Sequence, residues 1–168
     1  TTVCLPGTHA KWASLSGGHL AGFRTMMTGE MFALLGEASI LRHTVGTSDW
    51  SDSDFAAAVA EAHADPADCL GRLFGLRAGP LLFGEAAPTG SARLSGLLIG
   101  AEIATGMAGS DAPLCLVATA GMADRYAAAL TTLGIDFDTA DVEDAVRNGL
   151  FAMAARIWPE RELLETDA

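Results

Sequence analysis

The chain has 168 residues, half of them apolar, and a mean hydropathy of +0.30. A chain of this length and composition can bury a full hydrophobic core, which excludes intrinsic disorder. Acidic residues outnumber Lys and Arg by 21 to 10, giving a formal net charge of −11. Nucleic acid and anionic membrane surfaces are therefore excluded as partners, because both require basic patches.

The cysteines indicate a reducing compartment. Cys4, Cys69 and Cys115 are far apart and odd in number, so we expect free thiols. The histidines show no metal-ligand spacing, and we assign no structural metal. Because the chain has neither a signal-like start nor a run of about 18 apolar residues, we expect a cytoplasmic protein.

The start of the chain predicts three strands joined by tight turns. Its first turn holds Gly7 and Thr8, and Lys11 follows shortly after. A glycine lets the backbone approach a ligand closely, the threonine supplies a hydroxyl, and the lysine supplies a cation. Together these are the donors that bind a phosphate in a hairpin turn. The alternative is an ordinary surface hairpin, which the spacing alone favours.

The rest of the chain alternates between helical and strand patterns. Ser51 or Ser53 is expected to cap a helix that runs to Ala62. Two apolar stripes are expected to be buried: Leu70, Leu73, Phe74 and Leu76 in one helix, and Val142, Val146, Leu150, Met153 and Ile157 in the closing helix. The expected elements are a helix from Met31 toward Leu41, the capped helix, a helix over 67–76, a loop over 79–90, a helix over 91–107, a strand from Leu114, a helix after Gly121, a short strand over 136–138 and a helix over 142–157.

Two long segments carry a family resemblance. Residues 5–12 (LPGTHAKW) and 23–35 (FRTMMTGEMFALL), supported by 94–100 (LSGLLIG) and 124–126 (DRY), resemble the sugar-kinase branch of the actin/Hsp70/sugar-kinase superfamily. The chain looks most like the C-terminal lobe of the 2-dehydro-3-deoxygalactonokinases, and the resemblance covers nearly all of it.

This resemblance implies an α/β fold, an actin-like ATPase (ribonuclease H-like) lobe. Its mixed sheet would start with an antiparallel three-strand meander and carry helices on both faces. Residues 1–168 would form the C-terminal ATP-binding lobe of a two-lobed kinase. The N-terminal lobe, with its own phosphate-binding hairpin, would be absent from this chain.

The implied reaction transfers the γ-phosphate of ATP, with Mg²⁺, to the 6-hydroxyl of 2-dehydro-3-deoxy-D-galactonate, a step of galactonate degradation. Gly7 and Thr8 would bind the phosphates, and Lys11 would add a cation. The implied adenosine site is Ala120, Gly121 and Met122, and Thr28 and Gly29 would contact the sugar acid. The catalytic base is expected in the missing lobe. Within this chain Glu30 is the nearest candidate, although an acid in the first turn of a helix is as good an explanation for it.

Several alternatives remain open at the level of the sequence. The chain could be a superfamily ATPase without a sugar substrate, or a non-catalytic ATP-binding or interaction module. Asp124 could cap a helix instead of contacting a ligand. Gly96 and Gly100 could serve close helix packing or keep the backbone bare near a nucleotide.

Overall fold

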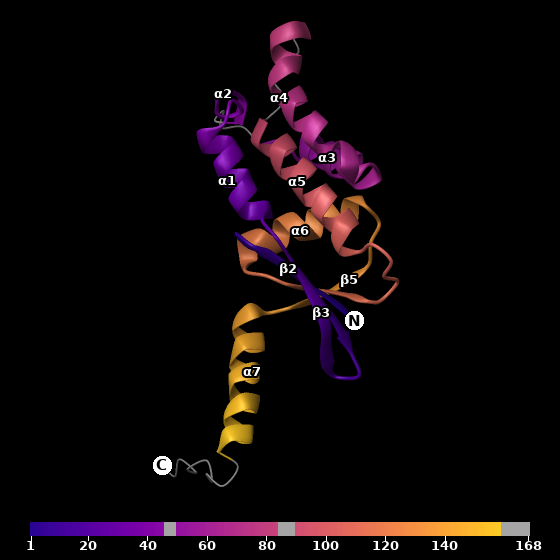
Figure 1. Cartoon of the computed structure of the whole chain (residues 1–168), viewed down its shortest axis with the longest axis vertical. Helices are drawn as coiled ribbons and strands as arrows, with labels where there is room; N and C mark the ends of the chain where they lie inside the picture. The colour runs from indigo at the N-terminus through magenta and orange to yellow at the C-terminus, as the bar shows by residue number, and fades with distance from the viewer. Residues whose placement is uncertain (46–49, 84–89, 159–168) are drawn as a thin grey trace.

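The computed structural model describes residues 1–45, 50–83 and 90–158, and a five-stranded mixed sheet lies at its centre (Figure 1). The strand order is β3-β2-β1-β4-β5. Strands β1 (Thr2–Leu5), β2 (Ala10–Ser16) and β3 (His19–Met26) form the antiparallel meander. Strand β4 (Leu114–Val117) is parallel to β1, and β5 (Phe137–Ala140) is parallel to β4. The predicted meander and mixed sheet are confirmed.

The turn between β2 and β3 depends on two glycines. Gly17 has φ of 57° and Gly18 has φ of 76°, in the left-handed region that glycine adopts without a steric penalty. Two consecutive positive φ angles match the right-handed twist of paired strands, so this turn fixes the register of the hairpin.

The helices follow the predicted order, with some shifted ends. Ser51 caps its helix as expected, its hydroxyl accepting a 3.1 Å hydrogen bond from the backbone N–H of Asp54. Pro80 lies inside a helix that continues to Phe83, so the expected loop over 79–90 is wrong up to that residue, and 84–89 fall outside the described residues. Residues 47–49 of the polar segment before Ser51 also fall outside them. The helices are α1 (Thr28–Ala38), α2 (Arg42–Val45), α3 (Asp52–Ala64), the short 3₁₀ helix η1 (Pro66–Asp68), α4 (Cys69–Phe83), α5 (Gly90–Gly106), α6 (Ala120–Thr132) and α7 (Val142–Ile157).

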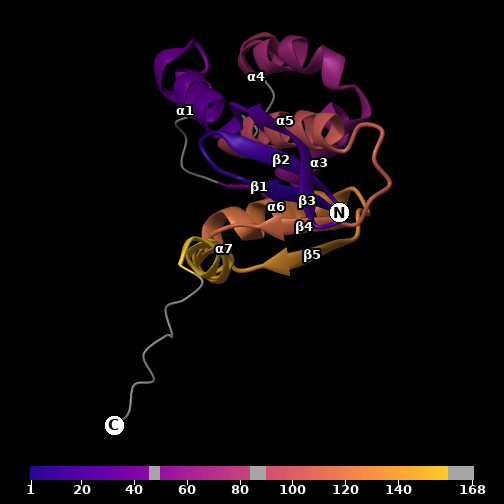
Figure 2. The same cartoon turned by 60° about the horizontal axis from the view of Figure 1, so that its bottom comes forward.

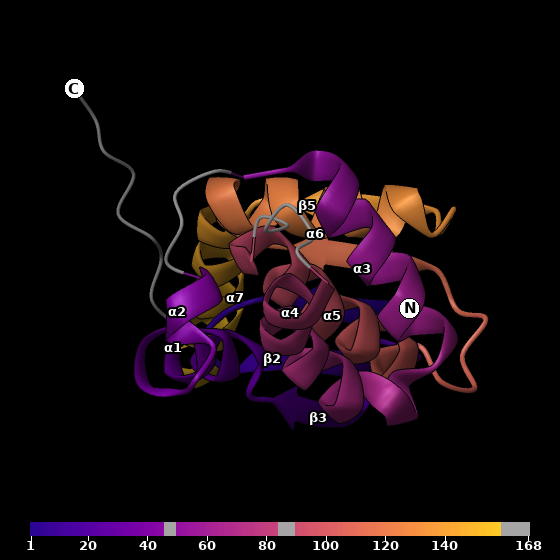
Figure 3. The ribbon, with the colours of Figure 1, turned by 90° about the horizontal axis from the view of Figure 1, so that it is seen from above.

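The main core lies between one face of the sheet and helices α3, α5 and α6 (Figure 2). Cys4, Trp12 and Leu116 point from three adjacent strands into this core, and each is at most 3% exposed. A second cluster joins α2, α3, α4 and α5 above the first, and Figure 3 shows these helices stacked over the sheet.

The opposite face of the sheet is not covered in the way the resemblance implied. Alternate residues of the meander point to this face, and Leu15 is 41% exposed and Phe23 is 65% exposed. Within the described residues, α3, α5 and α6 all pack on the other side. The expectation of helices on both faces is therefore wrong for this part of the chain.

The glycines of α5 serve helix packing. A Cβ on Gly96 would lie 2.5 Å from the carbonyl oxygen of Phe55, and one on Gly100 would lie 2.4 Å from that of Val59. Because no side chain tolerates such distances, both glycines let α5 press against the backbone of α3. Of the two explanations, helix packing is therefore the correct one.

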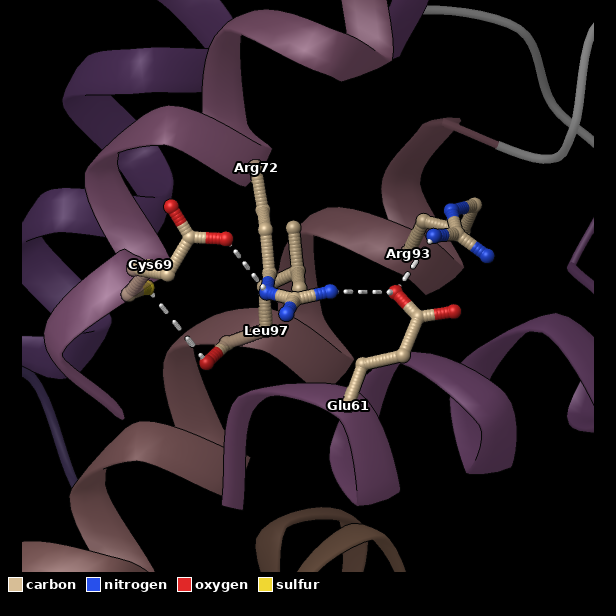
Figure 4. Close-up of polar contacts among 6 residues, drawn as sticks. Glu61, Cys69, Arg72, Arg93 and Leu97 are labelled. Carbon is tan, nitrogen blue, oxygen red and sulfur yellow. Dashed lines mark hydrogen bonds and ion pairs between the residues drawn. The ribbon is translucent and has the colours of Figure 1, made fainter. Parts of the chain in front are cut away.

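A charged cluster ties α3, α4 and α5 together (Figure 4). Glu61 accepts a 2.9 Å hydrogen bond from Arg93, and Arg72 lies 3.7 Å from the same carboxylate oxygen. Arg72 also pairs with Asp68 one turn before it, at 3.2 Å. Partly exposed pairs of this kind contribute little stability each, so their main effect is to fix how the helices are placed.

Two predicted core stripes are wrong in part. In α4, Leu73 and Leu76 are buried, but Leu70 is 77% exposed and Phe74 is 63% exposed. In α7, none of the residues is buried. A periodic pattern shows that a helix has an apolar face, but only the tertiary structure shows what covers it. Among the described residues, no helix is both long and apolar enough to cross a membrane.

Candidate functional site

A pocket of about 380 Å³ opens at the carboxyl edge of the sheet. The turn after β1, the first turn of α1, the middle of α5 and the start of α6 converge on it. Ligands of α/β folds bind in this position because loops from several strand ends meet there. The lining residues are Gly7, Thr8, Thr28, Gly29, Phe32, Ser95, Leu98, Ile99, Met122, Arg125 and Tyr126.

The predicted phosphate-binding turn is held against α1. The carbonyl oxygen of Thr8 accepts a 3.0 Å hydrogen bond from the backbone N–H of Glu30. Gly29 makes this contact possible, since a Cβ there would lie 2.6 Å from the carbonyl oxygen of Gly7. The turn and the helix therefore approach backbone to backbone, and a Cβ on Gly7 itself would meet nothing within 4 Å. Gly7 thus presents bare backbone to open space.

A hydrogen bond between two side chains lies on the outer side of this contact. His9 Nε2 lies 2.5 Å from Glu30 Oε2, and both side chains are partly exposed. Glu30 is not among the lining residues, because its carboxylate turns toward His9. In the structure Glu30 links the turn to the helix, and its role as a base stays a prediction.

A buried carboxylate lies behind the pocket. Glu102 is 4% exposed and accepts hydrogen bonds from the Trp12 indole at 2.8 Å and the Tyr126 hydroxyl at 3.0 Å. Burial raises the pKa of Glu102 above its ordinary value, while hydrogen bonds from Thr28, Trp12 and Tyr126 act in the opposite direction. Glu102 thereby connects β2, α1, α5 and α6, the elements that surround the pocket.

Sequence reasoning did not single out Glu102. The signal was a lone acid in the apolar segment between Gly100 and Ile103. An acidic side chain is rarely buried without partners, so its position in a core helix indicates a polar network.

The structure brings together many of the predicted binding residues. Gly7 and Thr8 lie in one lining with Thr28, Gly29 and Met122. The first and the last of these five residues, Gly7 and Met122, are more than 90 positions apart in the chain. Their convergence is a feature of the tertiary structure that the separate motifs only suggested.

The remaining predicted residues lie elsewhere. Lys11 is exposed, and its ammonium donates to the carbonyl oxygen of His9 at 2.8 Å. Gly121 lines a second hollow of about 280 Å³, together with Trp50, Asp52, Phe55, Asp124, Arg125 and Ala128. Ala120 is among the lining residues of neither hollow. The binding roles of Lys11, Ala120 and Gly121 stay predictions.

Arg125 is a cation among the lining residues of the main pocket, and Lys11, the cation that the sequence predicted there, is not among them. Arg125 lines both hollows, and its guanidinium lies 4.8 Å from the centre of the Trp50 ring. Stacking on an aromatic ring holds a guanidinium in place while leaving donors available for an anion.

The chain thus folds as a mixed α/β structure with a pocket at the carboxyl edge of its sheet. The model of the 2-keto-3-deoxy-galactonokinase family matches residues 1–153, and the chain belongs to that family. It is 43% identical over 162 residues to a protein of Rhizobium meliloti (strain 1021) named as a probable 2-dehydro-3-deoxygalactonokinase. That match covers 94% of this chain and 53% of the relative.

Two further comparisons agree. The 2-dehydro-3-deoxygalactonokinase of Escherichia coli (strain K12) is 32% identical over 152 residues, which is 89% of this chain and 52% of that protein. A crystal structure from Sinorhizobium meliloti, described under the same enzyme name, matches with a TM-score of 0.87 and 42% identity. It covers 94% of this chain and 54% of that one. The chain therefore spans about half the length of the curated relatives it matches.

Proposed function

We propose that this chain is the nucleotide-binding lobe of a kinase that phosphorylates the 6-hydroxyl of 2-dehydro-3-deoxy-D-galactonate with ATP. Membership of the family supports the reaction class. The observation that carries the proposal is the convergence of the Gly7–Thr8 turn, the start of α1 and the start of α6 on one pocket. We assign the lobe to the actin-like ATPase fold, and its free thiols suit the cytoplasm.

The pocket suits a nucleotide in its chemistry. Bare backbone at Gly7 and Gly29 and the hydroxyl of Thr8 form its polar side. Phe32, Leu98 and Met122 give it an apolar side on which a purine base can lie. The guanidinium of Arg125 offsets the negative charge of a phosphate in a chain that is strongly acidic overall.

In this assignment Gly7 and Thr8 bind the β- and γ-phosphates, and Met122 contacts the adenosine. Phosphoryl transfer needs positioning and charge stabilisation more than covalent chemistry from the protein, and Mg²⁺ neutralises part of the charge on ATP. Thr8 would donate its hydroxyl to an oxygen of the transferring group. Thr28 has its hydroxyl engaged by Glu102, so it would fix the start of α1 and offer the sugar acid its backbone.

No Asp or Glu is among the lining residues of the described pocket. A base that takes the proton of the sugar hydroxyl would therefore come from a second lobe that closes over this edge. Such closure would also exclude water and suppress hydrolysis of ATP. We accordingly propose that the partner of this lobe is the N-terminal lobe of the same kinase.

A coupled assay on the complete gene product tests the proposal. ADP release is measured with a panel of sugar acids that includes 2-dehydro-3-deoxy-D-galactonate and its C4 epimer, with ATP and Mg²⁺. We expect turnover with 2-dehydro-3-deoxy-D-galactonate at a higher kcat/KM than with the epimer. ATP hydrolysis that no sugar acid accelerates, or nucleotide binding without any turnover, would replace the kinase with an ATPase or a binding module.

A further inference from the structure

The proposed function gives Glu102 no part in the reaction, although this acid lies directly behind the pocket. It is 4% exposed, in the second half of α5, and is not among the lining residues. Burying a carboxylate costs free energy that an apolar side chain of similar size would not cost. Stability alone therefore does not explain an acid at this position, and its partners indicate what else it does.

One side of Glu102 is held by the rigid centre of the fold. Its Oε1 accepts the 2.8 Å hydrogen bond from the indole of Trp12. Trp12 lies on β2, where it pairs with Cys4 of β1 and Arg24 of β3. A Cβ on Gly106 would collide with the Trp12 ring, so the end of α5 lies directly against this side chain. Trp12 and α5 therefore keep the carboxylate in a fixed position.

The other partners of Glu102 belong to two walls of the pocket. The Tyr126 hydroxyl donates to Oε2 at 3.0 Å, and the Thr28 hydroxyl also bonds to the carboxylate. Thr28 opens α1 and Tyr126 lies in the second turn of α6. We refer to the lining residues of these helices as the α1 wall and the α6 wall; they are Thr28, Gly29 and Phe32 in the first, and Met122, Arg125 and Tyr126 in the second.

The starts of both helices lack the contact that most often fixes a helix start. Neither Met27 before α1 nor Thr119 before α6 makes a side-chain capping hydrogen bond, whereas Ser51 and Asp141 cap their helices. No residue of α1 is buried, so packing contributes little to its position. The placement of the two walls therefore depends on other contacts, and each wall has one to the same carboxylate.

We propose that Glu102 is a positioning residue of the kinase, which sets the separation of the two walls by holding Thr28 and Tyr126. The inference rests on the proposed function, in which the α1 wall contacts the sugar acid and the α6 wall contacts the adenosine of ATP. One buried carboxylate then determines how phosphoryl donor and acceptor lie relative to each other. Phosphoryl transfer depends steeply on this geometry, because a displacement of about 1 Å can lower a rate about a hundredfold.

Two substitutions separate the links of Glu102. Glu102→Met keeps the length of the side chain and removes both oxygens, so both walls lose their contact. In Glu102→Gln the amide oxygen must face Trp12, because an indole N–H can only donate. The NH₂ group then faces Tyr126, whose hydroxyl loses its acceptor. Glu102→Gln therefore keeps the link to the sheet and disrupts the link to the α6 wall, even if Glu102→Met fails to fold.

Hydrogen exchange of the complete gene product without ligand, followed by mass spectrometry, tests the positioning. We expect the start of α6 to exchange at least about fivefold faster in Glu102→Gln than in the parent, and the starts of both α1 and α6 to do so in Glu102→Met. Glu61→Gln is the matched control. The Glu61 carboxylate also joins helices, through Arg72 and Arg93, but Glu61 is not among the lining residues. In this variant the starts of α1 and α6 should exchange as in the parent.

Steady-state kinetics at a temperature where all variants are folded give the second readout. We expect kcat/KM for ATP to fall about tenfold or more in Glu102→Gln and to stay within about twofold of the parent in Glu61→Gln. Exchange in Glu102→Gln that is unchanged at the start of α6, or faster throughout the chain, would assign Glu102 to stability and overturn the proposal, as would an unchanged kcat/KM. Exchange requires no turnover, so a protein whose walls loosen as expected but which phosphorylates no sugar acid would refute the proposed function alone.

Discussion

At the scale of single residues, the Thr8 hydroxyl is the most direct test of the phosphate-binding turn. Thr8→Val keeps the shape of the side chain but removes the donor from the pocket lining. If the hydroxyl binds the transferring phosphoryl group, turnover of the complete enzyme should fall by an amount equivalent to about 2–4 kcal/mol, as for other donors that stabilise developing charge. The measurement is kcat together with a melting curve.

Thr25→Val is the matched control, because Thr25 is exposed on β3 and pairs with Lys11 away from the pocket. Both variants should melt close to the parent protein. Normal turnover of Thr8→Val would make the turn at Gly7 an ordinary hairpin bend.

Glu102 links stability to pH. Because burial raises the pKa of Glu102 in the folded state, the folded protein holds this proton more tightly than the unfolded chain does. Its contribution to stability is therefore greatest below the ordinary pKa of a glutamate and declines as the pH rises through the folded-state pKa. Glu102→Gln removes this decline, so the advantage of the parent over the variant should shrink between pH 5 and pH 8.

The free energies of unfolding at the two pH values check this prediction. Glu143→Gln, at an exposed position of α7, serves as the control and should show no such trend. A parent advantage that grows with pH would mean that the hydrogen bonds from Trp12 and Tyr126 outweigh the effect of burial.

Substitution of Gly121 tests whether this glycine is needed for adenosine binding or only for the conformation of the backbone. Its φ is not positive, and a Cβ there would meet nothing within 4 Å. Gly121→Ala should therefore fold normally or gain about 0.4–1 kcal/mol of stability. If adenosine lies against this residue, KM for ATP should rise while KM for the sugar acid stays the same. Unchanged KM values would assign Gly121 to the scaffold.

At the scale of elements, the close contact between the β1–β2 turn and the start of α1 determines how these two walls of the pocket are placed. Gly29→Ala would place a methyl group 2.6 Å from the carbonyl oxygen of Gly7, so the turn must move. We expect at least a tenfold loss of kcat/KM together with a lower melting temperature, because both the binding geometry and the packing change. Gly75→Ala in α4, where a Cβ has open space, is the control and should retain full activity. Equal activity of the two variants would show that the β1–β2 turn can move away from α1 without loss of function.

At the scale of the whole molecule, the 168-residue chain by itself should transfer no phosphate. The described pocket contains no acidic residue to act as a base, and it is open at the edge where a second lobe would close. The coupled assay on the purified chain should give a rate equal to that of its Thr8→Val variant, which reports any contaminating kinase. A rate clearly above the variant's would show that this chain carries the complete catalytic machinery.

Many elements of the fold, and the family of the chain, could be predicted from the sequence alone. Local signals predicted the meander, the Ser51 cap and the order of helices, because turns, caps and periodicity act over a few residues. Two long motifs indicated the family, and Gly7 and Thr8 stood out through the donors they supply. These inferences need only neighbours in the chain.

Only the tertiary structure decided which apolar and polar groups have partners. The stripes of α4 and α7 look alike in the sequence, yet Leu73 is buried and Leu150 is 62% exposed. Glu102 meets Trp12 from 90 positions away, and Met122 joins the Gly7 turn across a still longer interval. Periodicity shows that a face is apolar and composition shows that an acid is present. What covers the face, and what binds the acid, depends on contacts between segments that are distant in the chain.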